Sequence, residues 1–566
     1  MPAIDVTDPR SNVPVTDVGA AGSDVSKNKV RLPAHCVATE AYSDKSPAVT
    51  AARPSHEEVT HARDPLHVFD IPWTHSPSTS SDATASKSLP NYRTYVPGRT
   101  VLYAGFSSDQ DVNLLRHLPF DETQSFGTDN WRVWKAFPHE TAPAYFTSYP
   151  DFLLDCRGGI YDLESVERMV RPHQASLMDL YYSYVHPQYP ILESRETLER
   201  AIKARSVPSS LLAGIYVAAT SFLDCPPEFS VPLEDMYTFI FRSVTFEGRT
   251  PSLRTIQAIL LYMQLPPLRV REPNHPGFWA LTSQAVALAQ DIGLHVDPGN
   301  WNISPSERKI RRVLWWATYM QDKWLAHWLG MPSHIKNDQF NVEPLNMDDF
   351  SEQLQIEPAL SPSVEGFVEL TYLTTILSNV LDSLYTVRRG PGAMTPAEVL
   401  SHAGNCQSQL REWQSQHHAL LTRPNKVITD YVLLLAYYGI VISIQRALFS
   451  CVGGTSYYDI QREGLLFHQL FAVFEELLKQ EFEGLWLSYC KPNIAILGTF
   501  MITALLSSTD DEVYLARRSA LDEYRGLLDL MAERLDFAAL PRLRLNLLVE
   551  RFSSSDSGID PALRQN

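Results

Sequence analysis

Residues that often carry chemistry are widely spaced in this sequence. Its six cysteines stand at positions 36, 156, 225, 406, 451 and 490, and no two of them are close together. A structural zinc site needs ligand pairs only a few residues apart, because one turn must present two thiolates to a tetrahedral metal. The spacing therefore excludes a six-cysteine binuclear zinc cluster within this sequence. We expect the chain to hold no zinc and no other cofactor.

Motifs for enzymatic chemistry are also missing. The sequence contains no G-x-S-x-G turn, no H-E-x-x-H helix, no phosphate-binding loop with its lysine and no G-x-G-x-x-G. Asp291 and His295 lie four residues apart, but a metal would need further ligands, so we predict that His295 caps a helix C-terminus. His417 and His418 lie in a polar segment and are predicted to be at the surface. We therefore predict no catalytic or metal-binding residues and no enzyme; an enzyme on a helical scaffold stays open as a minor alternative.

Tryptophans are concentrated in one segment near the middle of the chain. Trp316, Met320, Trp324 and Trp328 recur every four residues, and Trp315 stands beside the first of them. This spacing places them on one face of a helix. We interpret that face as core packing, because a stripe of large rings buries a great deal of apolar area. A cage around a bound ligand is the alternative.

Charged residues surround this stripe. Asp322 and Lys323 precede Trp324, and we interpret them as a half-buried ion pair or as solvated charges, with a polar contact to an effector as the alternative. Positive charge is unfavourable at a helix N-terminus, so the basic residues that open the same predicted helix should meet acidic partners in the fold. Contacts to phosphate are the alternative. These basic residues are Arg308, Lys309, Arg311 and Arg312.

Length and charge limit the class of protein. The 566 residues are 44% hydrophobic, enough to bury a large core, and their net charge is −17. An acidic chain is repelled by phosphate backbones, which argues against autonomous DNA binding. The first residues form no apolar signal segment. The apolar run at 494–506 is too short to span a bilayer and is interpreted as a buried helix, so we predict an intracellular protein without a membrane segment.

The order of the elements indicates a helical body between two tails. Residues 1–91 are rich in Ser, Thr, Pro, Ala and Asp and are predicted to be a disordered tail. Residues 92–170 are predicted to form an ordered leader with one or two extended segments at 95–106, a small helix at 109–117 and an aromatic-rich loop. Helical spacing of apolar residues predicts helices at 173–186, 210–223, 233–246, 251–264, 278–293, 304–329, 364–388, 395–422, 426–451, 457–479, 490–506, 509–535 and 539–552.

Capping residues support several of these helices. Ser252 and Ser304 stand where N-caps are needed, and Thr509 is expected to cap a helix whose first turn is acidic. The second half shows no convincing alternating strands and no internal repeat. The predicted fold is all-α, a large irregular helical bundle. Residues 171–350 and 351–552 are two parts of one body, and residues 553–566 are a second disordered tail.

Two stretches in the middle of the chain resemble a known family. They are FWALTSQAVALAQDIGLHVDPGNWNISPSERKIRRVLWWATYMQDKW at 278–324 and GMPSHI at 330–335. Both resemble the regulatory middle homology region of fungal zinc-cluster transcription factors. With the leader YAGFSSDQDVNLLRHLPFDE at 103–122, they look closest to the nitrogen-utilisation co-activators of the TamA type.

The resemblance implies a function and partners. It implies a nuclear regulator of RNA polymerase II transcription, most simply a co-activator of a metabolic or biosynthetic pathway. The expected partners are a zinc-cluster factor that supplies DNA contact, the transcription machinery and an effector molecule. No DNA-binding residue is identified, and the expected regulatory or effector surface comprises Trp279, Gln284, Asp291, Trp315, Trp316, Asp322, Lys323 and Trp324.

Two other interpretations stay open. The chain could be an effector-sensing inhibitor that occupies zinc-cluster factors away from DNA. It could also derive from a gene model that lacks an upstream zinc-cluster exon, which translation of the preceding genomic DNA would reveal.

Overall fold

A small antiparallel sheet precedes the helices in this computed structural model. The structure describes residues 98–108, 110–137, 143–154, 163–220, 232–265, 277–389, 393–452 and 460–556. The tail predicted at 1–91 lies outside them, as do residues 557–566 of the tail predicted at the C-terminus. Residues 85–566 belong to one compact unit. The all-α prediction is confirmed for this body, with the sheet as its one β element among the described residues.

The sheet corrects the prediction of an aromatic-rich loop. Its strands lie in the order β1-β4-β3-β2 and pair antiparallel. The expected loop contains β2 and β3, and the expected small helix is the short α1 (Val112–Leu115). Val133 and Trp134 point to opposite faces and are both buried, so the sequence lacks the polar alternation of a one-sided sheet. The strands are β1 (Arg99–Ala104), β2 (Ser125–Gly127), β3 (Arg132–Phe137) and β4 (Ala144–Pro150).

The helices of the first half agree with the predicted ones to within a few residues. The central helix α6 is buried on every side from Ser209 to Ala219, as its uniformly apolar sequence predicts. Helices α3 and α5 were not predicted, because they are short and mainly polar. The elements are α2 (Asp151–Leu154), α3 (Leu163–Val170), α4 (Gln174–Leu180), a π-helical turn η2 (Tyr181–Val185), α5 (Arg195–Lys203), α6 (Ser209–Thr220), α7 (Leu233–Glu247), α8 (Leu253–Tyr262), α9 (Phe278–Asp291) and α10 (Pro305–Leu329).

The second half is helical as predicted. Its longest apolar helix, α15, passes the length and hydropathy test for a membrane span over Ile428–Cys451, but 61% of the most apolar window is buried inside the body, as in a core helix. The elements are η3 (Met347–Phe350), α11 (Ser351–Ile356), η4 (Pro358–Leu360), α12 (Ser361–Leu384), α13 (Pro396–Gln416), α14 (His418–Leu421), α15 (Ile428–Val452), α16 (Ile460–Leu478), α17 (Cys490–Leu506), α18 (Asp511–Ala532) and α19 (Asp536–Asp556).

The predicted caps are largely confirmed. Ser252 forms a capping box with Thr255, and the Ser304 hydroxyl accepts from the backbone N–H of Glu307 at 3.2 Å. The prediction for Thr509 is wrong by one residue: Asp510 caps α18 and accepts from two backbone N–H groups. A carboxylate in that position also interacts favourably with the helix dipole.

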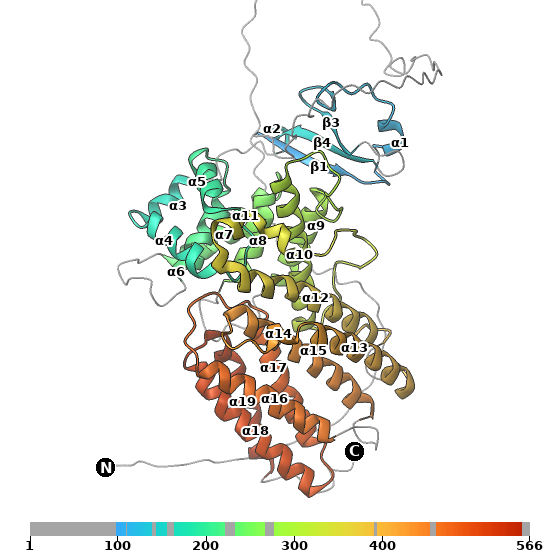
Figure 1. Ribbon diagram of the computed structural model, residues 1–566, viewed down its shortest axis with the longest axis vertical. Helices are drawn as coiled ribbons and strands as arrows, with labels where there is room; N and C mark the ends of the chain where they lie inside the picture. Colours follow the sequence, from blue (N-terminus) through green and yellow to red (C-terminus); the bar gives the residue numbers. More distant parts are fainter. Residues whose placement is uncertain are drawn as a thin grey trace, which may run out of the picture. The chain divides into compact units, whose positions relative to one another are not determined.

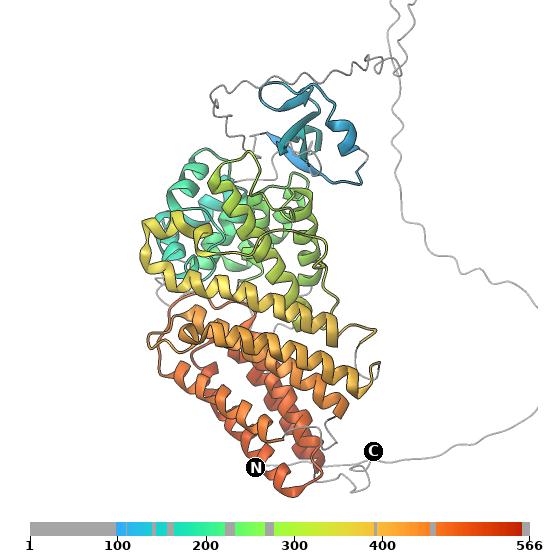
Figure 2. The ribbon, with the colours of Figure 1, turned by 45° about the vertical axis from the view of Figure 1, so that its right-hand side comes forward.

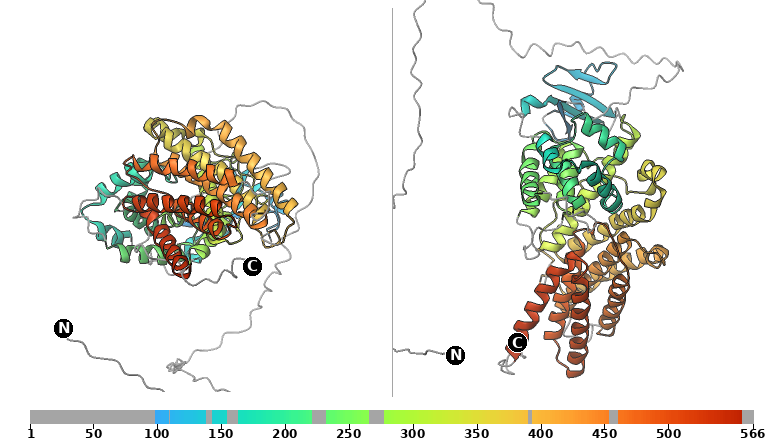
Figure 3. Two further views of the ribbon diagram at one scale, coloured as in Figure 1. Left: turned by 90° about the horizontal axis from the view of Figure 1, so that it is seen from below. Right: turned by 90° about the vertical axis from the view of Figure 1, so that its left-hand side faces the viewer.

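Helix α12 lies between the two halves of the body. It packs on α10 on one side and on α13 and α15 on the other (Figure 1). The second view shows α12, α13 and α15 as successive layers (Figure 2). The last helices, α16–α19, run side by side (Figure 3). One continuous hydrophobic core runs through both halves.

Candidate functional site

Helix α10 organises the centre of the molecule. Ser304 caps its start, Pro305 occupies its first turn, and Gly330 ends it in the left-handed conformation at φ 66°. Every residue from 313 to 326 is buried. A helix buried on all sides cannot offer an outer surface along this stretch. Its polar groups must therefore be satisfied within the fold.

The tryptophan stripe packs in the core, as predicted. Trp315 and Trp324 have no exposed surface, and Trp316 is 4% exposed. Two of the indole N–H groups donate hydrogen bonds within the fold. Trp316 donates to the carbonyl oxygen of Glu343 at 2.8 Å, and Trp324 donates to Thr374 Oγ1 at 2.9 Å. The stripe therefore joins α10 to α12 and to the segment that follows α10.

That segment, residues 331–346, is called the strap here. It runs along α10 in extended and turn conformation, and several of its side chains stay exposed. Phe340 packs against the rings of Trp315, Trp316 and Tyr319. Tyr319 donates to Asn337 Oδ1 at 2.9 Å. The middle of the strap is thus held on the aromatic face of α10.

Asp322 and Lys323 hold the first part of the strap. Both side chains are buried, 0% and 1% exposed, which corrects the prediction of a half-buried or solvated pair. Asp322 accepts from the backbone N–H groups of His334 and Ile335 and from His334 Nδ1, each at 2.9 Å. Lys323 donates to Ser333 Oγ at 2.9 Å and to the carbonyl of Ile335. Burial lowers the pKa of Lys323, and the Asp322 carboxylate opposes that shift.

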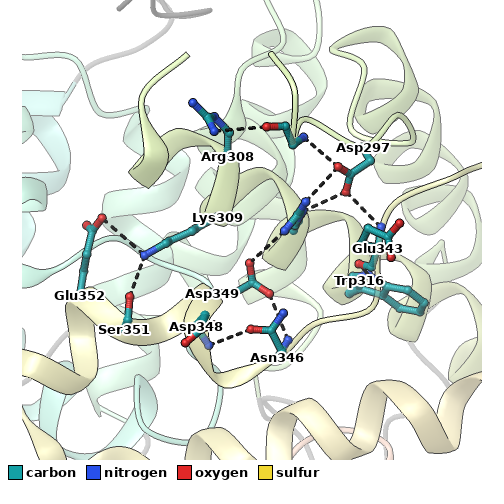
Figure 4. Close-up of polar contacts among 12 residues, drawn as sticks. Asp297, Arg308, Lys309, Trp316, Glu343, Asn346, Asp348, Asp349, Ser351 and Glu352 are labelled. Carbon is teal, nitrogen blue, oxygen red and sulfur yellow. Dashed lines mark hydrogen bonds and ion pairs between the residues drawn. The ribbon is translucent and has the colours of Figure 1, made fainter. Parts of the chain in front are cut away.

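The basic residues at the start of α10 hold the last part of the strap (Figure 4). Arg312 donates to both oxygens of Asp297 at 2.9 Å and lies 3.7 Å from Asp349. Asp297 in turn accepts from the N–H of Glu343 at 3.0 Å. Lys309 donates to Ser351 Oγ at 2.7 Å and lies 4.0 Å from Glu352 Oε1. The predicted acidic partners are confirmed for these two residues.

The other two basic residues are also engaged. Arg311 is buried, bonds Glu307 Oε1 at 3.2 Å and donates to the carbonyl of Ile292 at 2.9 Å. Arg308 departs from the prediction, because its partners are the backbone carbonyls of residues 299 and 303 rather than carboxylates. All four side chains are therefore committed to the fold, which leaves the phosphate alternative without support in this structure.

Asp297 is the acceptor on which these contacts converge. Burial acts to raise its pKa, but hydrogen bonds from Arg312, Glu343 and Gly299 outweigh burial and hold that pKa below its ordinary value. A depressed carboxyl pKa stabilises the fold above the unfolded value, and the contribution is lost as pH falls through the folded value. The network is therefore complete at neutral pH.

The end of α9 packs against the sheet. Gly293 takes φ 75°, and a Cβ there would lie 3.1 Å from the side chain of Tyr103. The prediction that His295 caps α9 is wrong: its ring packs between Tyr103 and Trp315, at centroid distances of 5.3 and 6.2 Å. The helix instead ends through the N–H of Leu294, which donates to Ala289 O. Burial lowers the pKa of His295.

The remaining candidates lie closer to the surface. Trp279 packs its ring on His334 at a centroid distance of 4.0 Å and is partly exposed, so it touches the strap. Gln284 is partly exposed and donates to the carbonyl of Val244 at 3.3 Å. Asp291 is exposed. The structure thus gathers most of the eight candidates on the strap and α10, but it buries Trp315, Trp316, Asp322, Lys323 and Trp324, which form no outer surface.

One surface hollow of the described residues lies on α13 and α14. It is shallow, about 430 Å³ in volume, and is lined by Arg411, Gln414, Ser415 and His418, away from all eight candidates. Within the part of the chain that the structure describes, no group of three or more His, Cys, Asp or Glu side chains is placed to hold a metal.

Sequence reasoning missed Asp297 and the strap. Asp297 lies in the loop between α9 and α10, fifteen residues before Arg312, so no helical spacing links the two. The strap has no helical or strand periodicity, and many of its contacts to α10 are made by backbone groups. The one available signal was charge: four basic residues at a helix start require acidic partners nearby.

Comparisons with known proteins agree with this architecture. Residues 178–415 match the fungal specific transcription factor domain. A transcriptional regulatory protein of Schizosaccharomyces pombe is 31% identical over 296 residues, covering 50% of this chain and 44% of that protein. The transcriptional activator protein DAL81 of Saccharomyces cerevisiae is 26% identical over 502 residues, covering 77% of this chain and 50% of that protein. Cutinase transcription factor 1 beta of Fusarium vanettenii is 26% identical over 193 residues, covering 32% and 21%.

These matches cover only part of each relative. The chain spans about half the length, or less, of these curated relatives. No solved structure matches. The matched domain begins in α4, contains α10 and the whole strap, and ends within α13. A buried α10 that holds the strap is thus the centre of the region, residues 178–415, that matches the fungal specific transcription factor domain.

Proposed function

We propose that this chain is a nuclear co-activator of RNA polymerase II transcription in a fungal metabolic or biosynthetic pathway, brought to DNA by a zinc-cluster partner. One observation carries the proposal: the similarity to a protein named a transcriptional activator extends over 77% of this chain. That share of the chain is larger than the matched domain at 178–415, so the similarity extends beyond the domain. The activating role, the partner and the pathway are part of the proposal.

Charge supports the indirect route to DNA. The chain carries a net charge of −17, and the basic residues that open α10 are all bound within the fold. Affinity for DNA depends on cations that neutralise phosphates and release counterions. A partner that keeps its zinc cluster would supply those cations. In this proposal the chain itself holds no zinc, which elemental analysis of the purified protein can check.

The strap and its surroundings are the proposed regulatory surface. Trp279 touches the strap through His334. Gln284 and Asp291 are at least partly exposed on the same helix, α9, and the buried candidates act by fixing the strap on α10. A partner that reads this surface needs the strap in one conformation. A rigid surface is less costly to bind, because less conformational freedom is lost on association.

Chromatin occupancy of the tagged protein tests the proposal. Focused promoter peaks that contain a zinc-cluster motif, and that disappear when the corresponding zinc-cluster gene is deleted, are the expected result. A matched strain with Trp279→Ala and Gln284→Ala should keep normal protein levels and lose peak height. Sequence-specific, salt-dependent binding of promoter DNA by the purified chain alone would overturn the indirect route. Absence of peaks from an abundant protein would favour an inhibitor that acts away from DNA.

A further inference from the structure

A histidine near the end of α13 makes two contacts that together require a proton. His417 ends α13, and its ring is one-quarter exposed. His417 Nδ1 lies 2.8 Å from the carbonyl oxygen of Trp413, and Nε2 lies 2.9 Å from Glu369 Oε2 on α12. The imidazole stacks on Trp413 at a centroid distance of 5.1 Å. The indole N–H of Trp413 donates to the same Glu369 oxygen at 3.2 Å.

The hydrogen-bond directions fix the number of protons. A carbonyl oxygen only accepts, so His417 Nδ1 must carry a hydrogen. The Nε2 contact then needs a hydrogen as well, either on the ring or on the Glu369 carboxyl group. If neither group carries it, a nitrogen lone pair faces a carboxylate at under 3 Å. Two acceptors at that distance repel each other, and the contact opens.

We propose that His417 and Glu369 form a proton-dependent latch, which fastens the end of α13 to α12 while one proton is shared and releases it when that proton is lost. The latch controls residues 413–427, which contain α14 and lead into α15. Trp413 and Leu420 in this segment are buried, at 5% and 6% exposure, so release would uncover apolar surface. The latch thus links ambient pH to the packing of the segment that directly follows the matched domain.

The surroundings of Glu369 shift its pKa in both directions. Burial raises the pKa of Glu369, while His417 and Trp413 oppose that rise. Because the proton would lie between two atoms 2.9 Å apart, it belongs to the pair rather than to either residue. A contact that binds a proton in the folded state stabilises the segment at low pH and loses that contribution as pH rises. The facing groups are Glu365 and Tyr372 on α12, Arg423 and Lys426 in the loop, Asp430 and Tyr437 on α15 and Glu476 on α16.

Amide hydrogen exchange of the full chain tests the latch. Protection of peptides that span residues 413–427 is measured at pH 6 and pH 8.5 and corrected for the intrinsic pH dependence of exchange. The wild-type protein should lose at least about tenfold of its protection at the higher pH, which corresponds to roughly 1.4 kcal/mol. Peptides from α10 should not change over the same range.

A charge-removing variant gives the discriminating result. In Glu369→Gln an amide nitrogen at the position of Oε2 can donate to an unprotonated Nε2, so this contact needs no shared proton, while the hydrogen bond from Trp413 is lost. This variant should stay protected at both pH values. The matched control Glu412→Gln changes an exposed carboxyl group on α13 and should keep the wild-type response. The proposal is overturned if wild-type protection is independent of pH, or if Glu369→Gln responds as the wild type does.

Discussion

At the scale of single residues, the Asp322–Lys323 pair shows how much depends on burial. Adjacent charges beside a tryptophan are compatible with an exposed pair, and only the fold reveals that both are enclosed. Their hydrogen bonds go mainly to the strap, since Lys323 Nζ lies 3.6 Å from Asp322 and closer to strap oxygens. The pair therefore acts as two anchors for one segment.

Replacing the lysine should be costly. Lys323→Met leaves the Asp322 carboxylate buried without its cation, and breaking a buried pair costs about 3–5 kcal/mol of unfolding free energy. Urea unfolding followed by circular dichroism measures the loss. Lys336→Met, an exposed position on the same strap, should stay within about 0.5 kcal/mol of the wild type. A loss under about 1 kcal/mol for Lys323→Met would show that the strap relaxes around the missing charge.

Gly293 offers a second prediction at this scale. An alanine there meets both a left-handed φ of 75° and the side chains of Tyr103 and Phe146 at 3.1–3.3 Å. Gly293→Ala should therefore cost about 1–3 kcal/mol and loosen the sheet. Gly277→Ala is the matched control, because its φ is 94° but nothing lies within 4 Å of the added Cβ. Faster amide exchange in β1 and β4 for Gly293→Ala alone is the expected outcome; equal effects of both variants would exclude close packing as the cause.

Asp430 gives a pH dependence whose sign can be worked out. Burial raises its pKa to about 6, although hydrogen bonding from Val427 and the charge of Arg423 oppose the rise. A raised pKa gives stability that is present below the unfolded value of about 4 and is lost as pH rises through about 6. The unfolding free energy of the wild type minus that of Asp430→Asn should fall between pH 4 and pH 7, by up to about 3 kcal/mol. A difference that is flat with pH, in unfolding curves taken across this range, would contradict it.

At the scale of elements, the long helices were predictable, and so was β1, which lies within the extended segments predicted at 95–106, whereas the rest of the sheet and the strap were not. Long helices such as α10 and α13 carry both apolar spacing and capping residues, so their sequence predicts them locally. The strands lack an alternating apolar and polar pattern, because both faces of the sheet are covered by apolar side chains. The strap has no local sequence signal, because its conformation is set by side chains of α10. These side chains meet the strap only in the folded chain. The residues of the candidate site could be selected from the sequence. The burial of Asp322 and Lys323 could not be predicted from it.

The strap should respond to loss of its main acceptor. Asp297→Asn keeps the size of the side chain but removes the charge that pairs with Arg312 and accepts from Glu343 N–H. Hydrogen bonds to charged groups contribute about 1.5–3 kcal/mol each, so exchange of strap amides should speed up by at least about tenfold. Exchange mass spectrometry of residues 331–346 measures this. Asp338→Asn, on the exposed edge of the strap, is the control; unchanged protection in Asp297→Asn would mean that the aromatic contacts alone hold the strap.

At the scale of the whole molecule, one loop ties the two halves together. The segment between α16 and α17 reaches back to the first half, where Leu485 N donates to Tyr184 O at 2.9 Å and Ser488 N donates to Gln264 Oε1 at 2.9 Å. Tyr489 lies within 3.3 Å of the side-chain amides of Gln264 and Gln321 and stacks on Trp324. The C-terminal helices are therefore coupled to α10, the same helix that holds the strap.

This coupling predicts how the molecule unfolds. Tyr489→Ala removes a buried ring and leaves the amides of Gln264 and Gln321 with fewer partners, a combined loss of about 3–5 kcal/mol. The loss falls on the contact between halves, so the C-terminal helices should open at lower urea than α6 and α10. Pulsed exchange across a urea series resolves the two transitions, and Tyr372→Ala, partly exposed on α12, should leave a single one. If both halves of Tyr489→Ala still open together, α12 rather than this loop transmits stability through the body, because α12 packs against both.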